Sequence, residues 1–158
     1  MKTRKLTASD VCEVTGYNRD QLKALLKELP DWSAAPSARI AREFSPHDLI
    51  VLGVVHALDS RVGIRRKRIA PMLAKLQQVL LGPREVDRSA RLIISFDPTH
   101  VEYVSEKTSI REGVLISLEP IFDRVDRYLG AVPSRNTAQE NLRLGPSSLR
   151  PRRSRAAG

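Results

Sequence analysis

Cysteine is almost missing from this sequence. Cys12 is the only one, so no disulfide can form within the chain and no metal site can be built from several cysteines. Histidine is scarce too: His47, His56 and His100 are far apart, and none has a partner at the four-residue spacing of a helical metal pair. We therefore expect no structural metal and no metal cofactor.

Long apolar runs are also missing. No stretch of about 18 apolar residues is present, so no membrane span is expected. The first residues, MKTRKLTASD, are basic but lack the apolar core of a secretory signal. The cytoplasm is the expected location.

Catalytic motifs are missing as well. The sequence has no glycine-rich phosphate loop, no glycine pattern around a nucleophilic serine and no metal-ligand spacing. The acidic residues Glu102, Glu106, Asp123 and Asp126 fall on faces predicted to be solvated. We do not expect an enzyme.

The chain does have an excess of positive charge, with a formal net charge of +9. Residues 1–81 and 132–158 are basic, whereas residues 82–131 are slightly acidic. This distribution is typical of a polyanion-binding protein with a separate partner-binding segment. A genome-wide preference for arginine is the alternative explanation.

Residues 6–29 predict two short helices joined by a tight turn. Thr7 and Asp10 form the signature of a first helix start, Gly16 fits its left-handed end, and Asn18 caps the second helix. The apolar stripe of the second helix consists of Leu22, Leu25, Leu26 and Leu29. This pattern indicates a helix-turn-helix, and a plain helical hairpin is the alternative.

In a helix-turn-helix the second helix enters the major groove of DNA. We predict this role for residues 18–28. The side chains predicted to contact DNA from this segment are Asn18, Arg19, Gln21, Lys23 and Lys27.

Residues 30–44 interrupt the helical pattern with Pro30 and Pro36, and residues 39–44 alternate like a strand. We predict a two-stranded wing that exposes Arg39 and Arg42 to phosphate or the minor groove. A loop with two solvated arginines is the alternative.

Two further helices are predicted before residue 82. Ser45 and Pro46 start a helix that is apolar over most of its circumference, and Gly53 within it suggests close packing against a neighbour. A second helix runs to about residue 81 and tolerates Pro71 near its front. The cations at 65–68, including Arg65 and Arg66, lie at the unfavourable end of this helix dipole. A DNA phosphate would compensate them, and a solvated cluster is equally consistent with the sequence.

The order of these parts resembles the MerR-type winged helix-turn-helix family. The resemblance covers residues 5 to about 81. The matching residues are Val11, Val14, Gly16-Tyr17-Asn18, Leu22, Arg42-Glu43-Phe44-Ser45, Asp48-Leu49, Leu52, Gly63 and Ile69. The resemblance implies DNA contacts from Asn18, Arg19, Gln21 and Lys23, and from Arg42 in the wing.

The chain departs from the family pattern at several points. Lys23-Ala24-Leu25 stands where the family often has Arg-Tyr-Tyr, and Glu43 replaces the second wing arginine. Neither metal-sensing cysteines nor a long dimerisation helix follows residue 81. Additional DNA contacts from residues 65–68 or from the tail are therefore expected.

The second half predicts a small α+β segment over residues 82–131, after a polar linker at 83–90. Residues 91–97 and 101–105 predict a hairpin with its turn at 98–100, and residues 113–118 a third, more buried strand. Residues 119–130 predict a helix with Pro120 at its first position. The alternative joins residues 113–129 into a single helix, against which Pro120 argues.

The predicted architecture is thus mainly α: a winged helix-turn-helix domain over 1–81, the α+β segment over 82–131, and a disordered basic tail over 132–158. The expected function is that of a sequence-specific regulator that binds double-stranded DNA, with a homodimer formed through 82–131. The alternative is a DNA-binding adaptor, excisionase-like or antitoxin-like, whose second half binds a protein.

Overall fold

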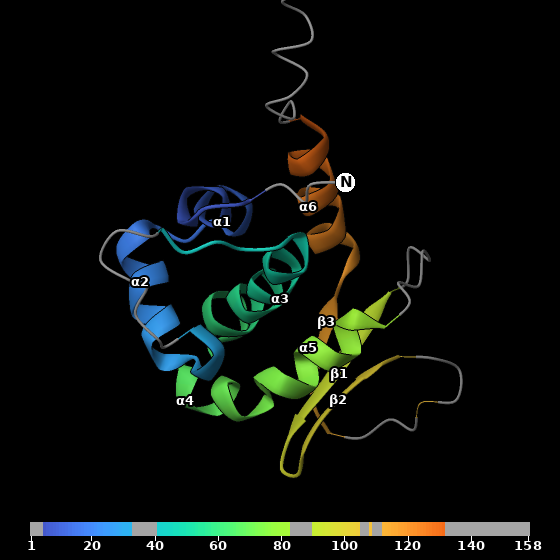
Figure 1. The fold of residues 1–158 in the computed structure, drawn as a ribbon. Helices are drawn as coiled ribbons and strands as arrows, with labels where there is room; N and C mark the ends of the chain where they lie inside the picture. Colours follow the sequence, from blue (N-terminus) through green and yellow to red (C-terminus); the bar gives the residue numbers. More distant parts are fainter. Residues whose placement is uncertain (1–4, 33–40, 83–89, 105–107, 109–111, 132–158) are drawn as a thin grey trace, which may run out of the picture.

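The computed structural model describes residues 5–32, 41–82, 90–104, 108 and 112–131. These residues are mainly helical and include one small sheet (Figure 1). The elements are α1 (Ala8–Thr15), α2 (Arg19–Glu28), a 3-10 turn (Pro30–Trp32), α3 (Pro46–His56), a π-helical turn (Ala57–Val62), α4 (Arg66–Ile69), a second 3-10 turn (Ala70–Met72), α5 (Leu73–Leu81), β1 (Arg91–Phe96), β2 (Thr99–Tyr103), β3 (Val114–Ser117) and α6 (Glu119–Ala131). The predicted tail and nearly all of the predicted linker lie outside the described residues.

The two predicted N-terminal helices are confirmed, and so are their boundary signals. The backbone N–H of Thr7 donates to Asp10 at 2.6 Å at the start of α1. Gly16 ends α1 with φ +89°, a left-handed conformation that glycine adopts without steric cost. Asn18 then caps α2, because its side-chain oxygen accepts the N–H of Gln21 at 2.8 Å.

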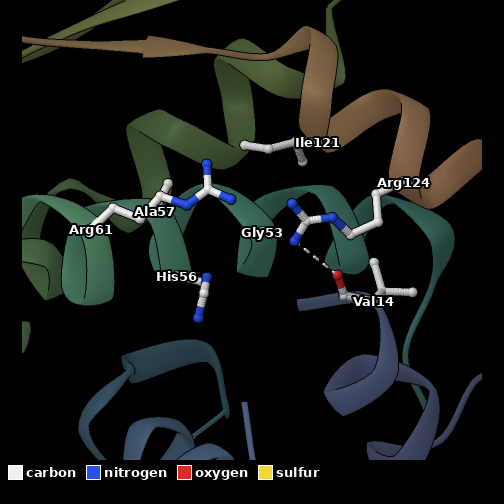
Figure 2. A pocket seen from close by; sticks show the side chains of 7 residues that line it. All are labelled: Val14, Gly53, His56, Ala57, Arg61, Ile121 and Arg124. Carbon is white, nitrogen blue, oxygen red and sulfur yellow. Dashed lines mark hydrogen bonds between the residues drawn. The ribbon is translucent and has the colours of Figure 1, made fainter. Parts of the chain in front are cut away.

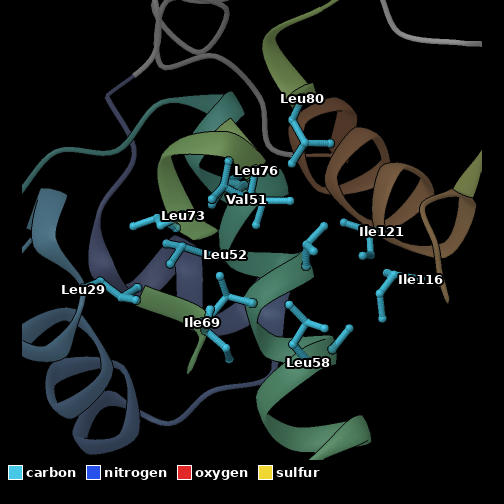
Figure 3. Packing of buried hydrophobic residues seen from close by; sticks show 14 of the residues in the cluster. Leu29, Val51, Leu52, Leu58, Ile69, Leu73, Leu76, Leu80, Ile116 and Ile121 are labelled. Carbon is cyan, nitrogen blue, oxygen red and sulfur yellow. The ribbon is translucent and has the colours of Figure 1, made fainter. Parts of the chain in front are cut away.

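Helix α3 lies at the centre of the fold, as its apolar circumference predicted (Figure 3). Ser45 caps it, and Pro46 occupies its first turn. Its completely buried residues are Leu49, Val51, Leu52, Val54 and Val55. Gly53 is where α6 approaches: a Cβ atom at this position would lie 2.8 Å from Cγ2 of Ile121.

The helix predicted up to residue 81 is interrupted. It consists of α4, a 3-10 turn at residues 70–72 and α5. Pro71 explains the break, because it has no N–H to donate and its ring crowds the carbonyl four residues earlier.

The second half forms an antiparallel sheet of order β2-β1-β3 followed by α6. The predicted hairpin is confirmed, with Ile94 opposite Val101. The turn is one residue tighter than predicted, since Thr99 and His100 already belong to β2. Strand followed by helix is confirmed over residues 113–130, so the single-helix alternative is wrong.

Strand β3 is less buried than predicted. It lies at the edge of the sheet, and Leu115 is 52% exposed while Ile116 is buried. The continuous apolar run therefore does not indicate a strand buried on both faces. Only one face of β3 meets the core, so burial alternates from one residue to the next.

The predicted two-stranded wing is not confirmed. Residues 41–43 form no strand, and residues 33–40 lie outside the described part of the chain. Phe44 instead pairs with Leu6 in an isolated antiparallel bridge, with N···O distances of 3.3 and 2.9 Å. Both side chains are buried, so burial of Phe44 against the N-terminal segment accounts for this pairing.

One hydrophobic cluster includes residues from both halves of the chain. Helix α6 packs on α3 and reaches α1, where the Tyr128 hydroxyl donates to Asp10 at 2.6 Å. The sheet and α6 therefore dock on the helices that precede them. This packing holds α1 and α3 from one side and leaves α2 at the opposite side of the fold (Figure 1).

Candidate nucleic-acid interface

Helix α2 buries its leucine side and presents its polar side to solvent. Leu22, Leu25 and Leu26 are buried. The predicted contact residues Asn18, Arg19, Gln21, Lys23 and Lys27 are all exposed. Because Arg19, Lys23 and Lys27 follow one another at intervals of four residues, their side chains are neighbours along one side of the helix. We call these three residues the α2 basic row.

Asn18 and Gln21 also build the start of the helix. Each side-chain oxygen accepts the backbone N–H of the other residue, at 2.8 and 3.0 Å. This reciprocal pair is a capping box. The Gln21 amide oxygen is therefore engaged in the cap, and the NH₂ group of this exposed side chain offers two further donors.

The basic start of α4 lies beside the end of α2 (Figure 1). Arg66 joins the two helices, with its guanidinium 3.5 Å from Glu28 and 3.2 Å from Asp59. Burial alone lowers the pKa of Arg66, but the hydrogen bond and charge of Asp59, together with Glu28, raise it above its ordinary value. Arg66 is thus a positioning residue whose charge is largely compensated within the protein.

Tyr17 extends this network from the turn between α1 and α2. Its hydroxyl donates to the same Asp59 oxygen at 3.3 Å. Burial first, and then the carboxylate of Asp59, raise the pKa of Tyr17 above its ordinary value. The network therefore ties the turn before α2 and the end of α2 to one carboxylate.

The other cations at the start of α4, including its N-cap residue, are exposed to solvent. Arg65, Lys67 and Arg68 are exposed. The guanidinium carbon of Arg68 lies 5.0 Å from the centre of the Phe96 ring, a cation–π distance that orients the side chain without neutralising its charge. These three residues form what we call the α4 basic cluster.

The two predicted wing arginines differ from the rest. Arg39 lies outside the described residues. Arg42 is half-buried, and its guanidinium donates to the backbone carbonyl of Trp32. Arg42 therefore links the start of the described segment at residue 41 to the 3-10 turn that follows α2.

Sequence reasoning missed the network of Tyr17, Glu28 and Asp59. Arg66 and Glu28 are 38 residues apart, and neither belongs to a motif that would pair them. Only the unfavourable position of cations at a helix start pointed to a need for compensating charge. That compensation is supplied within the protein for Arg66.

No helix of the described residues is long and apolar enough to cross a membrane. Within the same residues, no three His, Cys, Asp or Glu side chains gather in a way that could hold a metal ion. The chain matches no protein-family model, no curated protein and no solved structure.

Proposed function

We propose that this protein is a sequence-specific regulator of transcription that binds double-stranded DNA through α2. The observation that carries the proposal is the exposure of the whole polar side of α2, with the α4 basic cluster beside its end. A helix about 10 Å wide fits the major groove of B-DNA, which is about 12 Å wide.

The two groups of cations suit different parts of the duplex. Arg19 and Gln21 lie in the first turn of α2, the part of a second helix that contacts base edges in this motif. The α4 basic cluster would meet the phosphate backbone, which supplies affinity without sequence information. Arg66 and Arg42 would act indirectly, since both are engaged by protein groups.

Selection of bound duplexes from a random pool with the full chain tests this proposal. We expect a recovered site to bind about a thousandfold or more tightly than bulk DNA. Arg19→Ala should relax the sequence choice, whereas Arg127→Ala, which removes an exposed cation from α6, should change neither choice nor affinity. Unchanged affinity and choice in Arg19→Ala would refute α2 as the reading element.

Gln21 needs a variant that preserves the helix start. Gln21→Glu retains an acceptor for the N–H of Asn18 but replaces the NH₂ donors with oxygen. We expect an altered base preference with unchanged unfolding. If preference stays the same, Gln21 acts only in the cap.

The phosphate contacts have their own measurement. Replacing Arg65 and Lys67 with glutamine should weaken specific and nonspecific duplexes alike, and should reduce the slope of log K against log salt by about one per lost contact. An unchanged slope would place the α4 basic cluster away from the backbone.

A DNA-binding adaptor is the second candidate, favoured by the exposed edge of the sheet. β3 is an edge strand, and it presents Leu115 beside that edge. Edge strands recruit other strands, from a second copy or from another protein. Light scattering on wild type and Leu115→Glu separates the two: a dimer lost in the variant supports a homodimeric regulator, and a monomer that co-purifies with a protein supports the adaptor.

A further inference from the structure

A small cleft lies on the side of α3 where α1 and α6 meet it (Figure 2). Its polar lining consists of His56, Arg61 and Arg124, and Gly53 forms part of its floor. The interior volume of about 10 Å³ leaves room for about one water molecule. A large apolar ligand would not fit, so any ligand must be small or must enter by one end only.

The two guanidinium groups point toward one another across Gly53 (Figure 2). Arg61 comes from the π-helical turn after α3, and its side chain is exposed. Arg124 comes from α6 and donates to the carbonyl oxygen of Val14 at 3.4 Å, which satisfies the end of α1. Among the described residues, no carboxylate forms an ion pair with either group. Like charges facing one another in this way favour an anion between them.

His56 adds a third group whose protonation depends on the same charges. Its ring meets Tyr17 edge-on, with centroids 4.6 Å apart. Burial lowers the pKa of His56, Arg61 and Arg124 lower it further, and Asp59 alone opposes them. An anion beside the ring would counteract both arginines and favour the imidazolium.

We propose that this cleft binds a small oxyanion of the phosphate type, held between the guanidinium groups of Arg61 and Arg124 with His56 beside them. Guanidinium groups pair well with phosphate oxygens, in a planar two-donor geometry. Because the interior is so small, the oxyanion occupies the mouth, and any organic part of the ligand extends into solvent. This site is separate from the polar side of α2 and does not depend on DNA binding.

Calorimetric titration of the full chain with inorganic phosphate, at constant ionic strength against chloride, tests the proposal. Arg61→Gln removes an exposed cation that forms no ion pair among the described residues, so it should fold normally and weaken phosphate binding about tenfold or more. Arg127→Gln removes the same charge from the exposed side of α6 and should change binding less than about twofold. Equal effects of the two variants, or no phosphate binding by wild type, would overturn the proposal.

A second readout follows His56 directly. We expect sulfate, which keeps its double charge across the titration, to raise the pKa of His56 measured by NMR in wild type and less in Arg61→Gln. The groups that face His56 and must be accounted for are Tyr17, Asp59, Arg61 and Arg124. An unchanged His56 titration with sulfate would contradict the site. So would a loss of duplex affinity in Arg61→Gln without any phosphate binding, since the arginine would then serve the DNA backbone.

Discussion

Helices α2 and α3 begin with the same kind of cap but differ in how much of their surface is buried. Each starts with a capping box, Asn18 with Gln21 in α2 and Ser45 with Asp48 in α3. Yet α2 buries only one stripe, whereas α3 is buried on several sides. The caps fix where each helix begins, and the apolar spacing fixes how much of it is covered.

This difference separates stability from surface chemistry. The residues of α3 contact α1, α5 and α6, so a change there is felt through the whole core. The polar side of α2 contacts solvent, so its side chains can change without loss of packing. We therefore expect α3 to determine folding and α2 to determine binding, and each of the following experiments tests that division.

The largest expected effect is truncation in α3. Leu52 is completely buried, so Leu52→Ala should lower the free energy of unfolding by about 2–5 kcal/mol through lost burial and a cavity. Lys23→Ala on the exposed side of α2 should change it by less than about 0.5 kcal/mol and should weaken duplex binding instead. Urea unfolding measures both. A similar cost at the two positions would mean that α2 is also part of the core.

The next effect is at the contact of α3 with α6. Gly53→Ala places a methyl group 2.8 Å from Cγ2 of Ile121, which is branched at Cβ and cannot withdraw independently. Overpacking of this kind costs about 1–3 kcal/mol and outweighs the gain of about 1 kcal/mol in helix propensity. We expect net destabilisation in wild type.

A double-mutant cycle sharpens this prediction. In the Ile121→Ala background Cγ2 is gone, so Gly53→Ala should become stabilising by about 0.5–1 kcal/mol through helix propensity alone. A sign that does not change would show that Gly53 is not the contact that sets the distance between α3 and α6.

The caps give a smaller effect. Ser45→Ala and Asn18→Ala should each cost about 1 kcal/mol, because each leaves a helix-end N–H without its side-chain acceptor. Ser45 is half-buried and Asn18 is exposed, so water replaces the lost bond more easily at α2 and Ser45→Ala should cost more. The matched controls Ser45→Thr and Asn18→Asp keep an acceptor and should be close to neutral. The opposite order would mean that water reaches the start of α3 as well.

The parts of this fold that could be predicted are those decided by neighbours in sequence. Asp10, Gln21 and Asp48 each lie three residues after their capping partner. Gly16 adopts a left-handed conformation that glycine permits without steric cost. The exposure of the polar side of α2 followed from the same short-range spacing. The close neighbour of Gly53 was expected, but its identity was not.

The parts that could not be predicted depend on residues distant in the chain. Phe44 alternates like a strand residue, but its partner is Leu6, and no local pattern distinguishes that residue from a partner within a wing. The pairing of Arg66 with Glu28 and Asp59 could not be predicted either, because these residues come from elements that only tertiary packing brings together. The exposure of Leu115 likewise depends on β3 lying at the edge of the sheet. Burial and charge compensation are properties of the assembled fold.

The smallest expected effect concerns His56 at the end of α3. Because burial and two arginines lower its pKa below the ordinary 6.5, the folded protein disfavours the imidazolium. The stability that follows from this is present above pH 6.5 and is lost as the pH falls through the folded-state pKa. His56→Gln should remove this dependence, so the stability difference between wild type and variant should shift in favour of the variant by a few tenths of a kcal/mol on acidification. Unfolding curves collected at several pH values measure it. A difference that stays constant from neutral to mildly acidic pH would mean that His56 titrates alike in the folded and unfolded chain, and that the end of α3 is as open to water as the polar side of α2.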